Sequence, residues 1–458
     1  MDRPLRRCCL AACDTTWIRA GADGRAWSVG RFRVSSFAGS LNPRVRAGLC
    51  ALCSFPRFEL VRLLTRVHQS RGFSFRYFPM SIPSLSITGL GALSVLGADP
   101  GDHADGILAG SRRFRPLGEL LGCDSPHAGV PAGWIANRDL LIHRKWSPVT
   151  MAALHVARSA VAEAGWSSDE LRDAALVVGT SRGNAAGWLS PWPGRRPFRQ
   201  MRASNTIHSE PASAISIELG ITGPNHVLAS GCAAGLDAVG LAMMLVRAGA
   251  AARALAVAVD LPLVPTLLDS YADSGMLSKS AVADPYHPST DGFIPAEGAA
   301  AIAIESHAQG YVRLVHYGCN ADACDPLGIP ADGGLTPTLF KMLADADMWP
   351  AAVSPHATGT AVQRVADPAA LGRVFSGKKP TLHLLKPFTG HTIGASGLLE
   401  SVILAAFLRD RRLPPNPPGL TAPPGFILPD QSLAASGPVA KLSHAMGGHN
   451  ALLVLSSP

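Results

Sequence analysis

Three residues far apart in the chain have side chains that can do covalent chemistry: Cys232, His356 and His391. Cys232 follows a short apolar run and Gly231, and small residues follow it up to Gly240. This pattern predicts a strand, a tight turn and a helix that begins at the cysteine. The helix dipole places about half a positive charge there, so we expect a thiol pKa lowered from about 8.5 to about 3.5–7.5. Such a thiolate can hold an acyl group as a thioester; taken alone, the segment fits a buried structural cysteine better.

Two histidines stand in similar settings. His356 is followed by Ala-Thr-Gly-Thr, and His391 lies in Lys386-Pro-Phe-Thr-Gly-His-Thr-Ile-Gly. Each comes just past the end of an expected strand, and the carboxyl ends of strands are where α/β sheets open onto a crevice. A single loop histidine is usually a solvated or capping side chain. Two of them, each bracketed by glycine and threonine, favour a shared site with Cys232.

Expected strands and helices alternate from Met80 onward in two series, which meet near residues 305–310. The expected strands are 85–90, 174–179, 227–229, 254–259, 299–304, 311–317, 352–354, 381–385 and 452–455, and the expected helices are 151–165, 233–248, 336–346 and 395–408. Strands separated by helices predict an α/β fold with a mostly parallel sheet covered on both faces. We expect two related halves, at residues 80–305 and 306–458.

The first 79 residues differ from the rest, with 14 arginines, no lysine and four acidic residues. The net charge of +8 therefore divides into +10 for residues 1–79 and −2 for residues 80–458. A nearly neutral body gives no argument for nucleic-acid binding. We expect residues 1–79 to be a disordered extension or non-native upstream translation, and the second case makes Met80 the native start of the chain. The alternative is an arginine-rich targeting peptide.

The nine cysteines show no disulfide framework, which favours free thiols and a cytoplasmic location. Cys50 and Cys53, with Cys9 and Cys13, form a weak zinc candidate that lacks histidines, so we predict no metal site. No uncharged apolar run reaches the length of about 18 residues that a membrane span needs.

Four segments together resemble the elongating β-ketoacyl synthases of the thiolase superfamily, over about residues 82–457. They are the Cys232 segment, His356-Ala-Thr-Gly-Thr, the Lys386 to His391 segment, and Met446-Gly-Gly-His-Asn450. The resemblance implies a layered αβαβα core, an acyl carrier protein as partner, and malonyl and acyl thioesters as substrates. It implies no cofactor beyond the carrier's phosphopantetheine arm, and a homodimer or heterodimer.

The resemblance also implies roles for individual residues. Cys232 would take the acyl chain, and His356 and His391 would donate hydrogen bonds to an enolate oxygen. Lys386 would support the His391 region, with Glu400 and Glu297 as possible acidic partners. The implied binding groups are the backbone N–H groups of Cys232 and Met446 for the oxyanion, Thr358 and Thr360 for the pantetheine arm, and Gly447 and Gly448 for substrate.

The sequence departs from the family pattern at three sites: Met446 in place of a gatekeeper phenylalanine, Tyr286-His287 in place of Phe-Asp, and His449 in place of threonine. They favour a specialised synthase for a polyene or other secondary lipid over the housekeeping fatty-acid enzyme. The expected function as a whole is condensation in fatty-acid or polyene/polyketide-type lipid synthesis. The alternatives are a catalytically weak or silent partner subunit of a heterodimer, and a generic cysteine hydrolase. A basic cluster is a candidate docking patch for the acidic carrier protein, or an ordinary solvated loop: Arg195, Arg196, Arg199 and Arg202.

Overall fold

The computed structural model describes most of the chain after residue 83. The described residues are 14–20, 27–33, 84–185, 187, 204–280, 282–306, 310–345 and 348–458. Strands β1 (Asp14–Ala20) and β2 (Trp27–Arg33) pair antiparallel with each other. They belong to one compact unit, Met1–Met80, and the remaining elements belong to a second, Ser81–Pro458.

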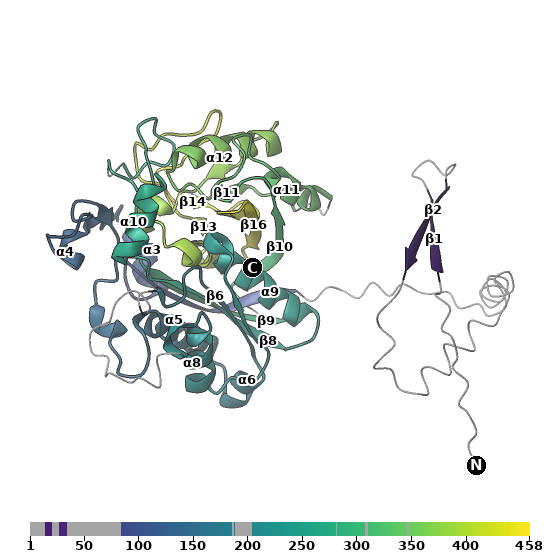
Figure 1. Cartoon of the computed structure of the whole chain (residues 1–458), viewed down its shortest axis with the longest axis horizontal. Coiled ribbons are helices and arrows are strands. Elements are labelled where there is room, and N and C mark those ends of the chain that lie inside the picture. The colour runs from purple at the N-terminus through teal and green to yellow at the C-terminus, as the bar shows by residue number, and fades with distance from the viewer. Residues whose placement is uncertain are drawn as a thin grey trace, which may run out of the picture. The chain divides into compact units, whose positions relative to one another are not determined.

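A ten-stranded sheet runs through the second unit (Figure 1). Its first five strands along the chain are β3 (Leu85–Ser94), β6 (Ala175–Gly179), β7 (Asn225–Leu228), β8 (Arg253–Asp260) and β9 (Gly298–Ser306). The other five are β10 (Val312–Ala321), β11 (Ala352–Ser354), β12 (Thr381–Leu382), β15 (Val439–Ala445) and β16 (His449–Ser456). The order across the sheet is β12-β11-β15-β16-β10-β3-β9-β8-β6-β7.

The two sets of strands have the same internal order. Reading outward from the centre, each set runs first, fifth, fourth, second and third strand, and β3 joins β10 antiparallel at the centre. In both sets the fifth strand is antiparallel to its neighbours, while the second, third and fourth strands are mutually parallel. The expectation of related α/β halves is confirmed. The expectation of a mostly parallel sheet was wrong, because the fifth strand of each half runs back against its neighbours.

Helices cover both faces of the sheet, and two central helices pack on each other. Helices α5 (Pro148–Ala164) and α8 (Glu210–Leu219) lie against the first set of strands. Helix α11 (Thr336–Asp345) lies against the second set, and α12 (Ala361–Val374) packs on α11. Between them α9 (Ala234–Arg247) packs directly on α14 (Ser396–Arg409). The shorter elements are α3 (Pro100–Leu108), α4 (Gly118–Leu121), α6 (Ser168–Arg172), α10 (Pro265–Asp273), α13 (Lys386–Thr389), β4 (Arg115–Pro116), β5 (Pro131–Ala132), β13 (Arg412–Leu413) and β14 (Leu433–Ala434).

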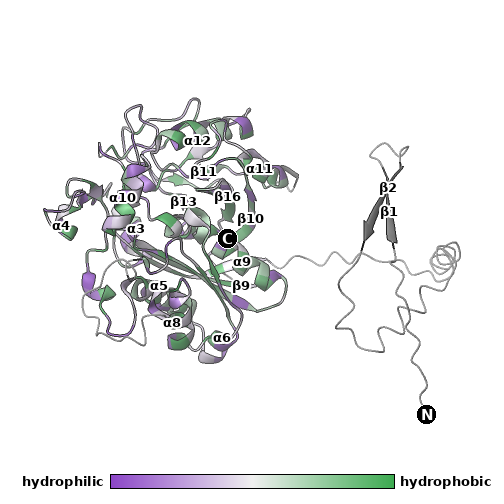
Figure 2. Ribbon diagram, viewed as in Figure 1, coloured by the Kyte–Doolittle hydropathy of each residue, from purple (hydrophilic) through white to green (hydrophobic). Residues whose placement is uncertain are grey.

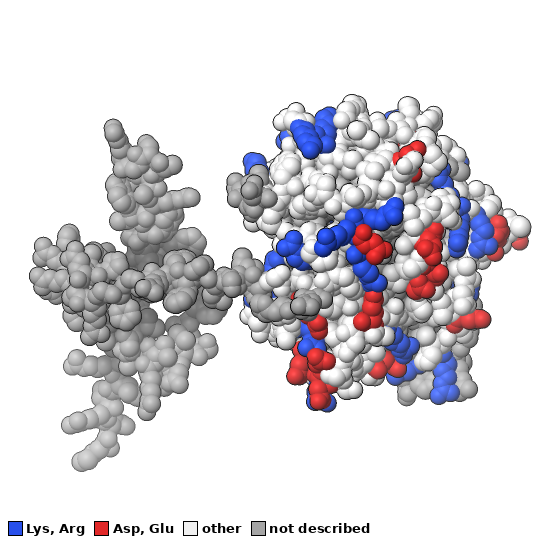
Figure 3. Space-filling view, turned by 180° about the vertical axis from the view of Figure 1, so that it is seen from behind, with Lys and Arg blue, Asp and Glu red and all other residues white. Residues whose placement is uncertain are grey.

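The burial pattern follows the composition of the elements. Strand β8 is buried at seven of its eight positions, and α14 buries 12 of its 14 residues, which agrees with central elements that are apolar on all sides. Hydrophobic residues run through the core elements and hydrophilic ones gather on outer helices and loops (Figure 2). In the described part of the chain no helix is both long and apolar enough to span a bilayer. On the face in Figure 3, basic and acidic side chains lie interspersed.

Candidate active site

Cys232 lies in a single 3₁₀ turn, Gly231–Ala233, between β7 and α9. Gly231 has φ +60, and a Cβ at that position would lie 3.2 Å from the Cβ of Ala445. The turn therefore needs glycine, both for its backbone angle and for its close approach to β15. This tight connection carries the Cys232 side chain to the wall of a pocket.

The charge state of Cys232 differs from the sequence-based expectation. Burial raises the pKa of the Cys232 thiol to about 11, against the lowering effect of the Lys386 charge. The expectation that the Cys232 pKa lies below 7.5 was wrong, because the free-energy cost of removing the thiolate from water exceeds its stabilisation by the nearby positive groups. The resting side chain is a neutral thiol.

His391 is fixed by the backbone on both sides. Its N–H donates to the carbonyl oxygen of Ile294 (2.8 Å), and its carbonyl oxygen accepts from the N–H of Ala296 (3.0 Å). The ring contacts Phe293 edge to face, with centroids 5.1 Å apart. Its Nε2 atom lies 3.3 Å from the Cys232 sulfur, and its Nδ1 atom lies 2.9 Å from Ser396 Oγ.

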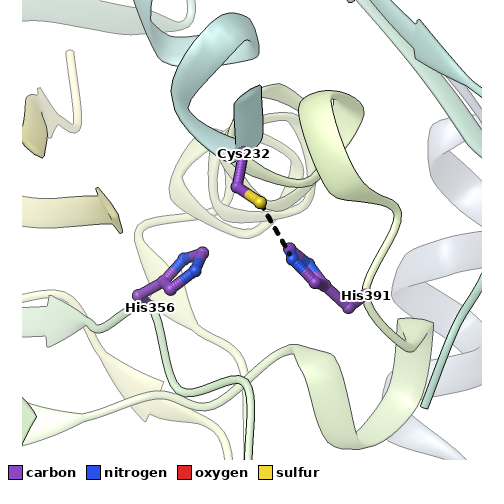
Figure 4. A group of neighbouring side chains, drawn as sticks. All are labelled: Cys232, His356 and His391. Carbon is purple, nitrogen blue, oxygen red and sulfur yellow. Dashed lines mark hydrogen bonds between the residues drawn. The ribbon is translucent and has the colours of Figure 1, made fainter. Parts of the chain in front are cut away.

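His356 approaches the same point from β11, in the second set of strands, which also carries His391. It follows β11, and the next residue, Ala357, has φ +47 and donates its N–H to Asp367 Oδ2 (2.7 Å). The His356 and His391 rings are 5.4 Å apart and nearly perpendicular, at 86°. Figure 4 shows both imidazoles pointing toward the Cys232 sulfur, and one donor atom from each of the three residues lies within 4.8 Å of the others.

Two buried lysines share one buried carboxylate behind the histidines. Lys386 Nζ lies 2.6 Å from Glu400 Oε1, and Lys441 Nζ lies 2.7 Å from Glu400 Oε2. Lys441 also donates to the carbonyl oxygen of Pro355, next to His356 (3.0 Å). The predicted Lys386–Glu400 pair is present, but sequence reasoning missed Lys441. Its only signal was a lysine in the otherwise apolar run Val439-Ala-Lys-Leu.

The electrostatic surroundings keep the two imidazoles neutral. Burial, reinforced by the Lys386 charge, lowers the pKa of both His356 and His391 well below the ordinary value. Lys441 adds a further positive charge to this effect, and burial lowers its own pKa to about 8. A neutral imidazole offers one N–H donor and one acceptor, so each ring can donate to an oxygen without carrying charge itself.

The Cys232, His356 and His391 donor atoms have a composition that thiophilic metals such as zinc accept. The surroundings oppose a cation, however, because Lys386 and Lys441 together carry one charge more than Glu400 neutralises. The lowered pKa values of the two imidazoles come from the same positive field. The described residues therefore suit an anion or a developing oxyanion better than a metal ion.

A pocket of about 470 Å³ opens onto the cysteine and the histidines. Thr358, Thr360 and Met446 line it, as do the apolar side chains of Leu327 and Ile329. Thr360 also caps α12 through the Gln363 N–H (3.3 Å). This volume is in the range typical of small-molecule sites.

Two groups of predicted residues lie elsewhere. Gly447 and Gly448 form the turn between β15 and β16 with φ values of +83 and +74, and they do not line the pocket. Glu297 pairs with Arg138 and accepts from the N–H of Ile135 (3.2 Å). The suggestion that Glu297 is an acidic partner of Lys386 was wrong, because Arg138 holds that carboxylate. Its neighbour Ala296 still anchors His391 through the backbone.

A second buried polar network was also missed by sequence reasoning. Asp367 accepts hydrogen bonds from Ala357, from Gln363 and from the Tyr286 hydroxyl (3.2 Å). Gln363 reaches His444 Nδ1 (2.7 Å), and the His444 ring packs 5.5 Å from that of His356. Tyr286, a departure from the family pattern, thus ties its loop to the loop that carries His356. The phenol supplies a hydroxyl that phenylalanine lacks.

His449, another departure, joins β16 to α9, the helix that follows Cys232. Its Nε2 atom lies 2.8 Å from Asp237 Oδ2 in α9, and Tyr317 donates to Oδ1 of the same carboxylate (2.6 Å). The hydrogen bond to Asp237 raises the pKa of His449. The arginine cluster at residues 195–202 and the four cysteines considered for zinc lie outside the described residues.

Comparison with known proteins agrees with this architecture. Two family models match consecutive segments: "Beta-ketoacyl synthase, N-terminal domain" at residues 139–310 and "Beta-ketoacyl synthase, C-terminal domain" at residues 311–419. A 3-oxoacyl-[acyl-carrier-protein] synthase 2 of Staphylococcus aureus is 26% identical over 405 residues, covering 80% of this chain and 99% of the relative. A protein of the same name from Coxiella burnetii is 27% identical over 409 residues, covering 81% and 97%.

Solved structures show the same fold. One is a type II PKS acyl-carrier protein in complex with its ketosynthase bound to the hexaketide (TM-score 0.72, 24% identity, covering 82% of this chain and 100% of that one). Another is the ishigamide ketosynthase/chain length factor (TM-score 0.73, 22% identity, covering 82% and 100%). The chain therefore belongs to the β-ketoacyl synthase family, the acyltransferase-type condensing enzymes of the thiolase superfamily.

Proposed function

We propose that this chain condenses an acyl group held on Cys232 with a malonyl unit delivered by an acyl carrier protein, with loss of CO2. The observation that carries the proposal is the convergence of the Cys232 sulfur with two neutral, buried imidazoles on one pocket. A nucleophile alone suits many reactions. Two uncharged N–H donors beside it suit a reaction in which negative charge develops on an oxygen of a second substrate.

The first half-reaction loads the acyl chain. The Cys232 sulfur attacks the thioester carbonyl of the acyl carrier, the bond to the carrier sulfur breaks, and the thiol proton moves to that sulfur. His391 Nε2, 3.3 Å from the cysteine sulfur, is placed to receive the proton and pass it on. The backbone N–H groups of Cys232 and Met446 are proposed to stabilise the intermediate oxyanion, as the family resemblance implies.

The second half-reaction forms the new carbon–carbon bond. The malonyl group loses CO2, and the electron pair of the broken carbon–carbon bond stays on the remaining group as an enolate. The enolate oxygen accepts hydrogen bonds from His356 and His391. One such donor is typically worth about 10²–10³ in rate. The enolate carbon attacks the Cys232 thioester, the carbon–sulfur bond breaks, and the cysteine sulfur takes up from water the one proton that the overall condensation consumes. Thr358 and Thr360, on the pocket wall, are proposed to hold the carrier's pantetheine arm.

Ser396 supports both half-reactions. Its Oγ accepts from the Thr392 N–H (3.0 Å) and lies 2.9 Å from His391 Nδ1. A hydroxyl can donate or accept a hydrogen bond, so Ser396 can form a hydrogen bond with His391 Nδ1 in either neutral tautomer of the ring. The tautomer with the proton on Nδ1 leaves Nε2 open for the thiol proton, and the other tautomer donates from Nε2 to an enolate.

The test compares wild type, Cys232→Ala and His356→Ala, each with acyl and malonyl carrier protein. Cys232→Ala should abolish acylation and condensation but still release CO2 from malonyl carrier. His356→Ala should still be acylated and lose CO2 release by about 100-fold. A wild-type chain that is never acylated in isolation, and that only supports a second ketosynthase chain, would establish the silent-partner alternative and overturn the proposal. A homodimer in the cytoplasm is the expected working state.

A further inference from the structure

Arg182 places a permanently charged group on the wall of the acyl pocket. It lies in the loop that follows β6, where its backbone N–H donates to Asp260 Oδ1 (3.0 Å). Arg182 lines the same pocket as Cys232, and the two are close enough for the guanidinium to act on the charge of the sulfur. Loading and condensation as proposed above give this arginine no role.

The guanidinium has few partners among the described residues. Its Nε atom donates to the Tyr271 hydroxyl (3.3 Å), and the group lies 5.7 Å from the centre of the Tyr271 ring. No carboxylate of a described residue forms an ion pair with it. The nearby Asp260 is occupied by other donors, namely the Thr180 hydroxyl and the backbone N–H groups of Ser181, Arg182 and Gly394. The four outer N–H groups of Arg182 have no hydrogen-bond partner in the described chain.

An unsubstituted alkyl chain is a poor ligand for a pocket whose wall carries the Arg182 guanidinium. Burying a charged group beside an apolar chain removes its water without replacing the lost hydrogen bonds, which is costly. An oxygen acceptor on the chain would replace them, and the planar guanidinium is suited to bind a carbonyl or carboxylate with two parallel bonds. Tyr271 fixes the guanidinium by hydrogen bond and ring contact, which favours one direction of approach.

We propose that the acyl chain loaded onto Cys232 carries an oxygen acceptor, a keto or carboxylate oxygen, that binds the outer N–H groups of Arg182. The inference rests on the proposed acyl transfer to Cys232 and adds the substrate class. The chemistry of loading is unchanged: the cysteine sulfur replaces the carrier sulfur on the acyl carbon, and the carrier leaves as a thiol. Arg182 takes part only by binding the chain.

The test measures acylation of Cys232 by intact mass, using carrier proteins that bear acyl chains of equal length. One chain is unsubstituted, one has a 3-keto group and one ends in a carboxylate. Wild type should load at least one oxygenated chain faster than the unsubstituted chain. Arg182→Met should lower kcat/KM for the preferred chain relative to the unsubstituted chain by about 10- to 100-fold, the usual worth of a hydrogen bond to a charged group.

The comparison of chains within each variant separates binding from reactivity. A general effect of Arg182 on the Cys232 thiol changes all three rates alike and cancels in their ratio. Arg182→Lys, which keeps the charge but not the planar fork, should lose part of the preference. Arg172→Met, which removes an exposed arginine in α6, is the matched control and should keep the wild-type ratio.

Each outcome distinguishes the two proposals. Preference for the keto chain or for the carboxylate chain identifies which oxygen is bound, and either supports the inference. Equal loading of all chains by wild type, or a preference that survives Arg182→Met, overturns the inference and leaves the proposed function intact. A rise in KM for malonyl carrier without any change in loading also overturns it, because Arg182 would then bind the malonyl carboxylate. Failure to load any chain overturns the proposed function itself.

Discussion

At the scale of single residues, Cys232 is a neutral thiol whose reactivity depends on its neighbours. Burial raises its pKa to about 11, so the thiolate is rare near neutral pH. His391 Nε2 lies 3.3 Å away and is kept uncharged by burial and by Lys386. The pair can therefore exchange a proton at the moment of attack, while the resting site stays free of a standing thiolate that oxidants would attack.

The raised pKa predicts the alkylation behaviour of Cys232. The rate constant with iodoacetamide should rise about tenfold per pH unit between about pH 7 and 9.5, without a plateau, because only the thiolate reacts. The rate is followed at each cysteine by peptide mass spectrometry, and the exposed Cys123 serves as the internal comparison. A plateau for Cys232 below about pH 8 would show that the helix start and the lysines outweigh burial.

Lys441 illustrates the cost of a charge held in the core. Its pKa falls from 10.5 to about 8 because burial disfavours the ammonium group. Between these two values the unfolded chain binds more protons than the folded chain, so the contribution of Lys441 to stability increases as pH rises through this window. Below about pH 8 the protonated side chain destabilises the fold.

We therefore expect Lys441→Met to raise the free energy of unfolding at pH 7 by about 1–3 kcal/mol, since Glu400 keeps Lys386 as its partner. The gain should shrink toward pH 9.5. Condensation should fall, because Lys441 also holds the Pro355 carbonyl beside His356. Denaturant unfolding at both pH values checks the stability, with Lys341→Met on α11 as an exposed control. A loss of stability at pH 7 would contradict the argument.

At the scale of elements, the site depends on how closely α9 and α14 pack. These helices start immediately after Cys232 and shortly after His391, so their separation sets the distance between sulfur and imidazole. Gly235 in α9 permits the contact: a Cβ there would lie 2.8 Å from the backbone nitrogen of Leu398 and 2.9 Å from the carbonyl oxygen of Gly394. Ile393, with φ +48, lies in the same junction.

Gly235→Ala should cost about 1–3 kcal/mol of stability, the usual range for overpacking, and should slow acylation of Cys232. Gly372→Ala is the matched control, because Gly372 lies in α12 with open space around its Cβ position. It should stabilise the fold by about 0.4–1 kcal/mol. Thermal unfolding and acylation rates check both variants. Equal effects of the two substitutions would show that the α9–α14 contact does not position the cysteine.

At the scale of the whole molecule, contact between the central helices of the two halves explains why residues so distant in sequence meet. Cys232 follows the third strand of its half, and His391 follows the third strand of the other half, each close to the start of a central helix. His356 follows the second strand of the C-terminal half. Strands β7 and β12 lie at opposite ends of the strand order, and the packing of α9 on α14 brings the residues that precede these two helices together.

The unit Ser81–Pro458 contains the core and the site, while Met1–Met80 clusters separately. A chain that begins at Met80 should keep its thermal midpoint within about 1 °C of the full chain, since a loss of about 1 kcal/mol would shift the midpoint of a unit of this size by about that much. It should also acylate Cys232 at the same rate. A lower midpoint or a slower acylation would show that residues 1–79 contribute to the folded enzyme.

The amino-acid sequence alone determined the class of fold and the three central residues. Buried apolar strands alternating with helices, and glycine beside Cys232 and His391, are local patterns with local physical causes. The resemblance carried by four short motifs added the family and the Lys386–Glu400 pair. Lys441 and the His444–Gln363–Asp367 network were missed, because polar residues in strand β15 and helix α12 give no local sign of their distant partners.

Tertiary structure decided what depends on desolvation and on contacts between distant segments. It reversed the expected direction of the Cys232 pKa, because burial depends on what packs around the sulfur and not on its position along the helix. It paired Glu297 with Arg138, and it placed beside Cys232 the Arg182 guanidinium, which has no carboxylate partner among the described residues. Residue order fixes which groups are available, but only packing fixes the water and the charges around each of them.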